Sequence, residues 1–399
     1  MTDPEGTDRA AGAASPTRDE GTDVGPGPAA SPARTASAAP APAPASVAAG
    51  GPAGDPAPAG IDPSGVTAWF AAHIPAEAPL TFRLIAGGRS NLTFAVTDRA
   101  GRRWVLRRPP TGHLLPTAHD MGREHRIISA VGPAGIPVPR ALGYCDDPAV
   151  TGAAFYVMEF VDGHILRVEG DAAAAFDPAG RRRISEHLVD TLAALHALDP
   201  DAVGLGDLGR RDGYVARQLR RWYGQYCANR DEQDGPDVPD VDRVHDHLAA
   251  RIPEQGPAGI VHGDYRLDNT VVADDGSVAA VLDWELCTLG DVLADVGQLL
   301  VYWAEPGESS VLAHTATTDG GFLTRAELAD RYARVSGHSL DQLDYYVAFA
   351  YWKLACILEG VYVRYVRGAM GQDGFDFAGY PDMIRDLAAR AAAAAERVA

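Results

Sequence analysis

The stretch that decides the fold is His262-Gly263-Asp264-Tyr265-Arg266-Leu267-Asp268-Asn269, followed by Val281-Leu282-Asp283-Trp284-Glu285. It has the pattern HxDxxxxN, and Asp283 comes 14 positions after Asn269. Two short β-type runs separated by an Asp-Asp-Gly turn fill that interval. Because a hairpin returns the chain to its starting point, Asn269 and Asp283 are predicted to lie side by side at the mouth of a cleft.

Asp264, Asn269 and Asp283 are the residue types that phosphoryl transfer to a hydroxyl requires. One carboxylate must orient the hydroxyl and accept its proton, and hard oxygen ligands must hold Mg²⁺ against the phosphates of a nucleotide. Asp264 is therefore predicted to be the catalytic base. The Asn269 amide oxygen and the Asp283 carboxylate are predicted to be the metal ligands.

Three neighbours in the same motif need separate interpretations. Arg266 is assigned to the catalytic centre together with Asp264. His262 is predicted to brace the loop by hydrogen bonds, which is the commoner role of a histidine in such a position. Asp268 is interpreted as a turn-forming residue, as most loop aspartates are.

A glycine turn lies upstream at 86–91, between two predicted strands. Glycines let a backbone approach phosphate groups, so the N–H groups of Ser90 and Asn91 are predicted to bind nucleotide oxygens. Further along, Arg107 shares a strand face with Val105, and Glu124 shares a helix face with apolar neighbours. A buried carboxylate needs a cation, which predicts an Arg107–Glu124 ion pair that clamps the nucleotide phosphates; the alternative is an exposed arginine on an edge strand.

The hydrophobic pattern predicts a β-rich part followed by a mainly helical part. Strands are expected at 81–86, 92–97, 103–108, 139–144, 155–161, 259–261, 270–273 and 278–282, and helices at 64–73, 119–131, 180–198, 212–229, 240–251, 291–303, 325–336, 341–366 and 381–397. This predicts an α+β fold of two lobes, 61–160 and 161–399. Residues 1–60 are rich in Ala, Pro and Gly and are expected to form a disordered tail, with a Pro-rich partner ligand as the alternative.

Composition limits the classes of partner. The 399 residues are 46% hydrophobic, enough for a large core, and carry a net charge of −19, which disfavours nucleic acid and anionic membranes. No signal peptide and no apolar run long enough to cross a bilayer are predicted, so a cytoplasmic location is expected. Four cysteines without a CxxC pair argue against a zinc cluster or a disulfide framework. The sequence carries no signal for an oligomeric state.

The chain resembles the aminoglycoside phosphotransferase and choline kinase branch of the protein-kinase-like fold, within it the subgroup related to the phosphotransferase domain of acyl-CoA dehydrogenase fusion proteins. The matching blocks are 87–91, 104–110, 123–126, 155–163, 262–269, 283–285 and 290–295. The resemblance implies ATP (or GTP) and Mg²⁺ as cofactors and a small-molecule acceptor. It also implies that Met158 to Gly163 is the hinge, where the Glu159 carbonyl and the Val161 N–H contact the base of the nucleotide. Asp295 is expected to brace the catalytic loop.

One residue departs from the family pattern. The phosphate-clamping cation of kinases and of most aminoglycoside enzymes is lysine, but the single lysine of this chain, Lys353, lies in a C-terminal helical stretch. Arginine at 107 keeps the charge but has a different shape and reach. A nucleotide-binding module with weak or no turnover is therefore the main alternative to an enzyme.

The identity of the acceptor also stays open. Arginines gather around the start of the predicted helix 212–229, at 210, 211, 217, 220 and 221. A basic helix suits an anionic acceptor such as a hydroxyacyl-CoA, although a solvated helix face explains the same pattern. An aminoglycoside or another antibiotic is the alternative acceptor. The chain has no GxSxG, no HExxH and no GxGxxG after a strand, so hydrolase, zinc protease and dehydrogenase functions lack their minimum motifs.

Overall fold

The computed structural model describes residues 58–86, 91–111, 119–231, 235–308, 315–368 and 376–398. Most of the predicted tail and the predicted phosphate-binding residue Ser90 lie outside these residues. The elements in chain order are α1 (Pro63–His73), β1 (Thr81–Ala86), β2 (Leu92–Thr97), β3 (Arg103–Arg108), α2 (Met121–Val131), β4 (Ala141–Cys145), β5 (Phe155–Glu159), α3 (Asp171–Ala175), α4 (Pro178–His196), α5 (Tyr214–Asp231), α6 (Pro239–Ala249), β6 (Ala258–Val261), β7 (Thr270–Val272), β8 (Val278–Val281), β9 (Thr288–Asp291), α7 (Leu293–Tyr302), α8 (Arg325–Ser336), α9 (Leu343–Val366) and α10 (Tyr380–Ala395).

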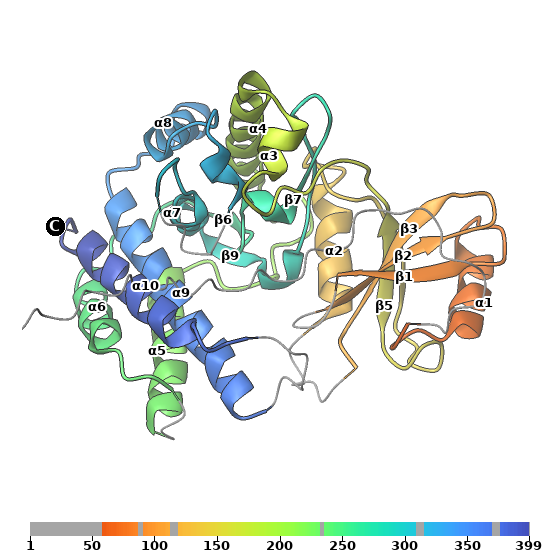
Figure 1. Ribbon diagram of the computed structural model, residues 1–399, viewed down its shortest axis with the longest axis horizontal. Coiled ribbons are helices and arrows are strands. Elements are labelled where there is room, and N and C mark those ends of the chain that lie inside the picture. Colours follow the sequence, from red (N-terminus) through yellow and green to blue (C-terminus); the bar gives the residue numbers. More distant parts are fainter. Residues whose placement is uncertain are drawn as a thin grey trace, which may run out of the picture. The chain divides into compact units, whose positions relative to one another are not determined.

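The N-terminal lobe, α1 to β5, is built on one antiparallel sheet. Its strand order is β1-β2-β3-β5-β4, so the first three strands form the predicted meander and β5 inserts between β3 and β4. Alternate residues of β3 face opposite sides: Trp104 and Leu106 join a core with α1, whereas Val105 joins a core with α2. Figure 1 shows the two helices on opposite sides of the sheet. Arg107 is thereby directed to the α2 side, where Glu124 lies.

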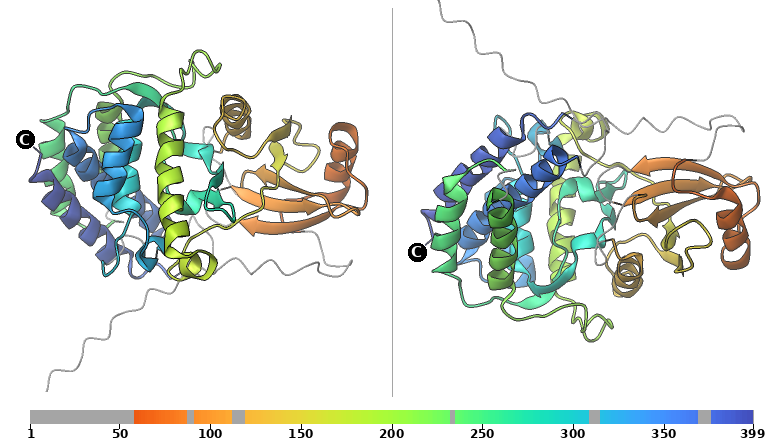
Figure 2. Two further views of the ribbon diagram at one scale, coloured as in Figure 1. Left: turned by 90° about the horizontal axis from the view of Figure 1, so that it is seen from above. Right: turned by 90° about the horizontal axis from the view of Figure 1, so that it is seen from below.

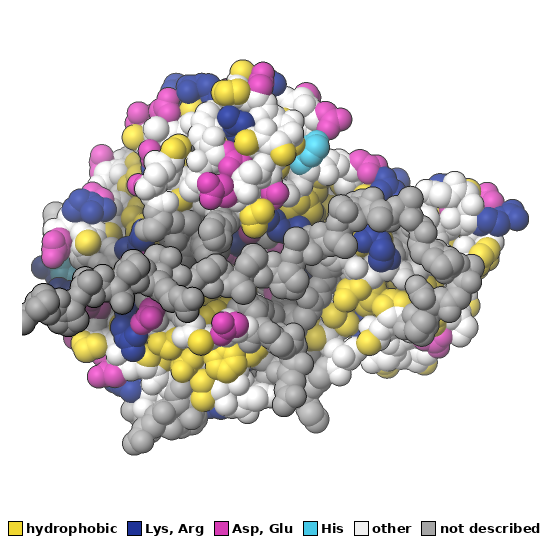
Figure 3. Space-filling model, in the orientation of Figure 1, with side chains coloured by type: hydrophobic (Ala, Val, Ile, Leu, Met, Phe, Trp, Pro, Cys, Tyr) yellow, Lys and Arg dark blue, Asp and Glu magenta, His cyan; other side chains and the backbone are white. Residues whose placement is uncertain are grey.

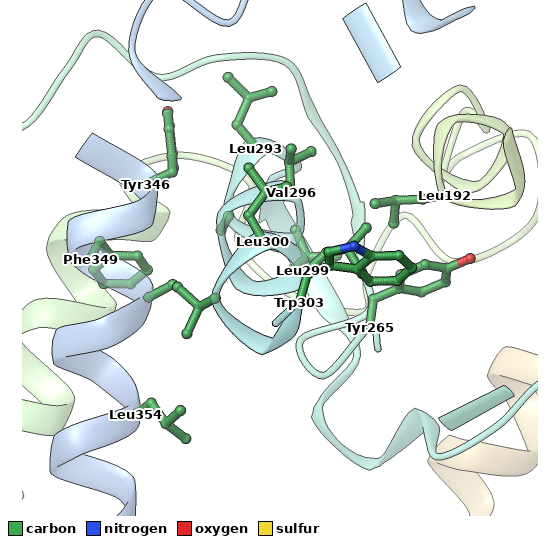
Figure 4. Close-up of a cluster of buried hydrophobic side chains, with 14 of the residues drawn as sticks. Leu192, Tyr265, Leu293, Val296, Leu299, Leu300, Trp303, Tyr346, Phe349 and Leu354 are labelled. Atoms are coloured by element: carbon green, nitrogen blue, oxygen red, sulfur yellow. The ribbon is translucent and has the colours of Figure 1, made fainter. Parts of the chain in front are cut away.

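The C-terminal lobe, α3 to α10, is mainly helical, as predicted. Long helix α9 packs against α7, α10, α5 and α6 (Figures 1 and 2). Figure 4 shows α7 between two layers, with Leu293, Val296, Leu299, Leu300 and Trp303 set between the α9 side chains Tyr346, Phe349 and Leu354 on one side and Tyr265 and Leu192 on the other. Because Tyr265 belongs to the HxDxxxxN motif, this layer fixes the motif against the core.

Helix α9 corrects one prediction from the sequence. Its 24 residues include a window of mean hydropathy 1.3, so by length and composition it could span a bilayer, contrary to the expectation that no apolar run is long enough. In the structure 67% of that window is buried inside the protein. Two charged residues of α9, Lys353 and Glu359, are buried in the protein interior. The neighbouring helices α7 and α10 pack against α9. Its apolarity is therefore accounted for by packing in the core of this lobe.

Two small elements were not predicted. Helix α3 has only five residues, and β9 is a four-residue strand, Thr-Leu-Gly-Asp, that ends where the predicted helix 291–303 was expected to begin. Strand β9 pairs with β6, with Val261 opposite Thr288. So short a strand has no readable periodicity, and its partner lies 27 positions away in the chain, so only the tertiary structure reveals it.

The cysteines and the distribution of surface charge can be compared with the sequence composition. All four cysteines are unpaired. On the face shown in Figure 3, basic side chains (dark blue) and acidic ones (magenta) are interspersed. The net charge of −19 is thus not gathered into one acidic field on that face.

Candidate active site

The loop that carries HxDxxxxN is held from behind by α7. The carboxylate of Asp295 accepts hydrogen bonds from the backbone N–H groups of His262 (2.6 Å) and Gly263 (2.8 Å). Burial opposes ionisation of Asp295, but the contact with His196 and the loop N–H groups outweigh it and hold the pKa of Asp295 below its ordinary value. The bracing contact predicted for Asp295 is present.

His262 also braces the loop. Its side chain is fully buried, and its Nδ1 accepts a hydrogen bond from the N–H of Asp264 (3.2 Å). Because Nδ1 accepts, Nε2 carries the proton and donates to the carbonyl of Leu282 (3.0 Å). The ring therefore links the loop to the end of β8, in keeping with the structural role predicted from the sequence.

The carboxylate of Asp264 is oriented by hydrogen bonds to both of its oxygens. Oδ2 accepts from Asn269 Nδ2 (2.8 Å) and Arg266 Nε (3.3 Å), and Oδ1 accepts from Gln298 Nε2 (3.0 Å). Its side chain remains 21% exposed. Asp264 is thus fixed in direction and still reachable from solvent.

Arg266 lies between two carboxylates. Its Nη1 contacts Asp268 Oδ2 at 2.8 Å, its Nε contacts Asp264, and its guanidinium covers the ring of Tyr302 with 5.0 Å between their centres. Asp268 lines the main cavity, and burial raises its pKa above the ordinary value. Asp268 therefore forms an ion pair at the site, a contact that its interpretation as a turn-forming residue did not include.

The β7–β8 hairpin brings the two predicted metal ligands together. Thr270 pairs with Val281, and the N–H of Leu282 donates to the carbonyl of Asn269 (2.8 Å), so Asn269 and Asp283 stand at the open end of the same hairpin. Asn269 Nδ2 is used by Asp264, which leaves its amide oxygen for a cation. Asp283 adopts φ +64°, a left-handed conformation that turns the chain at this point.

The donor set fits a magnesium ion shared with a nucleotide. No group of three or more His, Cys, Asp or Glu side chains that could hold a metal occurs in the described part of the chain. Mg²⁺ in kinase-type sites takes one or two protein oxygens and completes its shell with phosphates and water. One amide oxygen and one carboxylate are consistent with that arrangement.

A cavity of about 590 Å³ opens beside these residues. Its walls include both predicted ligands and Arg107, and the β-rich side contributes apolar groups such as Tyr156 and Met158. Val161, predicted at the hinge, lines the cavity. Glu159 is not among the lining residues; its carboxylate lies 3.9 Å from Arg140 on the surface. The predicted contact of its backbone carbonyl with a nucleotide stays a prediction.

The ion pair predicted between strand and helix is present. Arg107 Nε lies 2.9 Å from Glu124 Oε2, and the two side chains are only 12% and 3% exposed. The same guanidinium reaches Asp283 Oδ1 at 2.6 Å and Thr93 Oγ1 at 3.3 Å. The contact with Asp283 was not predicted. It follows from the fork shape of arginine, which can serve two carboxylates at once.

Glu124 has three partners at the site. Besides Arg107, it accepts hydrogen bonds from Tyr156 Oη (3.1 Å) and Asn91 Nδ2 (2.8 Å). Burial nevertheless raises its pKa to about 7, in spite of the opposing effect of Arg107. Asn91, predicted to bind phosphate through its N–H, has a buried side chain that also reaches Glu285 (3.3 Å). That side chain has a structural role, and the role of its N–H stays a prediction.

Sequence reasoning missed two residues on the far side of the loop. Gln298 lies one helical turn beyond Asp295 on α7, and this i, i+3 spacing was the signal that could have found it. Lys353 was set aside as remote, but its Nζ lies 3.0 Å from Gln298 Oε1 and 3.4 Å from the carbonyl of Gly263. It lies directly behind the loop, because α9 packs on α7.

Comparison with known proteins agrees with this geometry. The model of the phosphotransferase enzyme family matches residues 81–333. The chain belongs to that family. Acyl-CoA dehydrogenase family member 11 from Gallus gallus is 36% identical over 320 residues, covering 77% of this chain and 40% of that protein. The chain thus spans about two fifths of the length of this curated relative.

Solved structures extend the likeness to the fold. A crystal structure from Ralstonia eutropha, whose name assigns it provisionally to the aminoglycoside phosphotransferases, is 31% identical with a TM-score of 0.70, covering 85% of this chain and 99% of that one. An aminoglycoside phosphotransferase in ternary complex with AMP-PNP and hygromycin B is 16% identical with a TM-score of 0.54, covering 84% and 98%. The fold is therefore that of the bilobal, kinase-like small-molecule phosphotransferases.

Proposed function

We propose that this protein is a Mg²⁺-dependent phosphotransferase that moves the γ-phosphate of ATP or GTP to a hydroxyl of a small molecule. The observation that carries the proposal is the placement of Asp264 beside Asn269, with Asp283 at the other end of the same hairpin. The two proposed metal ligands line one cavity, and the proposed proton acceptor is hydrogen-bonded to one of them, which supports the constellation that phosphoryl transfer needs. Family membership supports the same reaction class.

Each residue has a stated task in this proposal. Asp264 accepts the proton of the acceptor hydroxyl, and Arg266 holds the Asp264 carboxylate from one side. Asn269 and Asp283 hold Mg²⁺, which when bound neutralises charge on the nucleotide phosphates. Arg107 contacts the phosphates while Glu124 holds its guanidinium in place. Val161 and the backbone near Glu159 contact the base of the nucleotide.

The acceptor that we favour is anionic, with a hydroxyacyl-CoA as the candidate. Among the predicted basic cluster, Arg211 is paired with Asp201 and Arg217 binds backbone carbonyls, whereas exposed Arg221 covers the ring of Trp222 at 4.9 Å. Arg221 does not line the cavity beside Asn269 and Asp283, so a contact between it and the acceptor is part of the proposal. A polycationic aminoglycoside would be repelled by such a group. The curated relative named above is called an acyl-CoA dehydrogenase family member, which supports a thioester.

One observation favours the alternative, a nucleotide-binding module with weak or no turnover. Arg107 occupies an oxygen of Asp283, so the predicted metal ligand is already paired with a guanidinium. Only Oδ1 of Asp283 is in this contact, so Mg²⁺ would have to use Oδ2 or displace the guanidinium from Oδ1. A lysine with its single charged nitrogen could not hold Glu124 and Asp283 in the same forked manner.

The decisive experiment measures ATP and GTP consumption with Mg²⁺ across two acceptor sets, hydroxyacyl-CoA thioesters and aminoglycosides. We expect phosphorylated product, identified by mass spectrometry, from the thioester set and none from the Asp264→Asn variant. Binding of Mg·ATP without product from any acceptor would favour the non-catalytic alternative. Product only from aminoglycosides would refute the proposal of an anionic acceptor but would still support a phosphotransferase activity.

A further inference from the structure

The single lysine of the chain is connected to the predicted catalytic base through one side chain. Lys353 is 6% exposed and its Nζ donates to Gln298 Oε1 (3.0 Å). Gln298, itself 9% exposed, donates from Nε2 to Asp264 Oδ1 (3.0 Å). The three groups form a continuous line from the core of the C-terminal lobe to the candidate active site.

The ammonium group decides which way the Gln298 amide faces. An ammonium can only donate hydrogen bonds and an ionised carboxylate can only accept them. The amide oxygen must therefore face Lys353 and the amide nitrogen must face Asp264. The reversed amide would set NH₂ against NH₃⁺ and a carbonyl oxygen against a carboxylate, two repulsive contacts in a buried place.

Helix packing brings the two partners within reach. At Gly297, next to Gln298, a Cβ would lie 2.5 Å from the backbone oxygen of Tyr346, so α7 and α9 approach as closely as a glycine allows. Lys353 lies seven positions, or two helical turns, beyond Tyr346 and thus on the same face of α9. Lys353 also donates to the carbonyl of Gly263 (3.4 Å), so it holds the loop backbone as well as Gln298.

The surroundings of Lys353 leave little room for a ligand. The cavity that it borders with Tyr302, Leu354 and Ile357 measures about 10 Å³, which is no more than a single water molecule needs. Burial lowers the pKa of Lys353, while the charges of Asp295 and Asp264 oppose that effect. The two oxygens to which its Nζ donates, those of Gln298 and Gly263, are neutral and belong to the loop and its support, so its position serves the loop and not an acceptor.

We infer that Lys353 is a positioning residue: its ammonium orients the amide of Gln298, which in turn holds the Asp264 carboxylate in the direction from which it receives the acceptor proton. This inference rests on the proposed function of Asp264. It accounts for a buried lysine that the phosphate clamp does not use. It also assigns a task to Gln298, which no motif in the sequence indicated.

The first arm of the test does not depend on activity. Because the chain has one lysine, labelling with ¹⁵N-lysine gives a single Nζ signal in the full-length protein. We expect this signal to shift in Gln298→Leu and, by a smaller amount, in Asp264→Asn. Glu359→Gln, a change of an equally buried polar residue on the same helix, is the matched control and should leave the signal unchanged. An Nζ signal unmoved in Gln298→Leu would overturn the inference.

The second arm is kinetic. We expect Lys353→Met and Gln298→Leu each to lower kcat about 10- to 100-fold, with KM values for acceptor and ATP within about twofold of wild type. The double variant should resemble the single variants, because both substitutions remove the same link. If Lys353→Met folds poorly, Lys353→Arg is the variant to use. It keeps the positive charge, so its kcat should lie between those of wild type and Gln298→Leu. A raised acceptor KM at constant kcat, or losses that multiply in the double variant, would overturn the inference. A failure of the proposed function can be told apart from a failure of this inference, because in the first case the wild-type protein itself transfers no phosphate.

Discussion

Two buried cations flank the candidate site, and they differ in what surrounds them. Arg107 lies within 3 Å of the carboxylates of Glu124 and Asp283, so its guanidinium balances two negative charges at the wall of the cavity. Within the described residues, the hydrogen bonds of the Lys353 ammonium go to two neutral oxygens, those of Gln298 and Gly263. Loss of Arg107 would leave a buried charge without its partner, whereas loss of Lys353 would leave a neutral amide free to turn. The first cation is therefore expected to serve stability and nucleotide binding, and the second the alignment of Asp264.

Asp264→Asn should have the largest effect. It tests the group that Lys353 is inferred to align without changing the contacts of Arg107. The amide cannot accept the acceptor proton, so kcat should fall by about 10² to 10⁴-fold, the usual contribution of a general base. Affinity for Mg·ATP should stay within a few-fold of wild type, because the Arg107 cluster is unchanged. Steady-state kinetics and calorimetry measure the two quantities. Turnover near the wild-type rate would remove Asp264 from its assigned role.

Arg107→Ala tests the other cluster. The substitution leaves Glu124, whose side chain is only 3% exposed, without its cation, so the free energy of unfolding should fall by about 3 kcal/mol. The KM for ATP should rise, because the nucleotide loses a phosphate contact. Denaturant unfolding and ATP kinetics give the readouts. Arg107→Lys is the matched variant, which keeps the charge but not the fork. Unchanged stability and unchanged ATP kinetics in Arg107→Ala would show that no clamp exists and would strengthen the non-catalytic alternative.

Asp283→Ala should have a smaller and different effect on the same cluster. Removal of a charged ligand should weaken Mg²⁺ and nucleotide binding together, by about tenfold or more, while Arg107 keeps its pair with Glu124. Unfolding stability should therefore change far less than in Arg107→Ala. Isothermal calorimetry with Mg·ATP, compared with ATP in the absence of Mg²⁺, checks the prediction. Equal Mg·ATP affinity in variant and wild type would contradict the assignment of Asp283 as a metal ligand.

The smallest expected effect concerns pH. Burial raises the pKa of Glu359 from an ordinary value of 4.5 to about 7, and Asn229 donates to its carboxylate (2.8 Å). The folded state therefore binds more protons than the unfolded state between about pH 4.5 and 7, so the contribution to stability is present at low pH and is lost as pH rises through 7. Glu359→Gln should remove this loss and be about 1–2 kcal/mol more stable than wild type at pH 8. Chemical unfolding at pH 5 and pH 8 tests it, and a variant no more stable at pH 8 would contradict the raised pKa.

Local pattern alone was enough for most of the architecture. The alternation of β3 placed Val105 and Arg107 on one face, the helical spacing of α2 placed Glu124 among apolar residues, and the hairpin after Asn269 predicted its approach to Asp283. Each of these is a contact whose geometry follows from a period of two or 3.6 residues or from one tight turn. The change from a β-rich to a mainly helical pattern predicted the two lobes, and the family resemblance implied the same arrangement.

Contacts between distant segments were decided only by the tertiary structure. Three such contacts are the pairing of Val261 in β6 with Thr288 in β9, the reach of Arg107 to Asp283 and the position of Lys353 behind Gln298. They join residues that lie 27, 176 and 55 positions apart. No local period connects such residues, because their distance depends on how helices and sheets pack against one another. The sequence by itself determined most of the elements and the central groups Asp264, Asn269 and Asp283, whereas the close approach of α7 and α9 decided that the single lysine lies behind the catalytic loop.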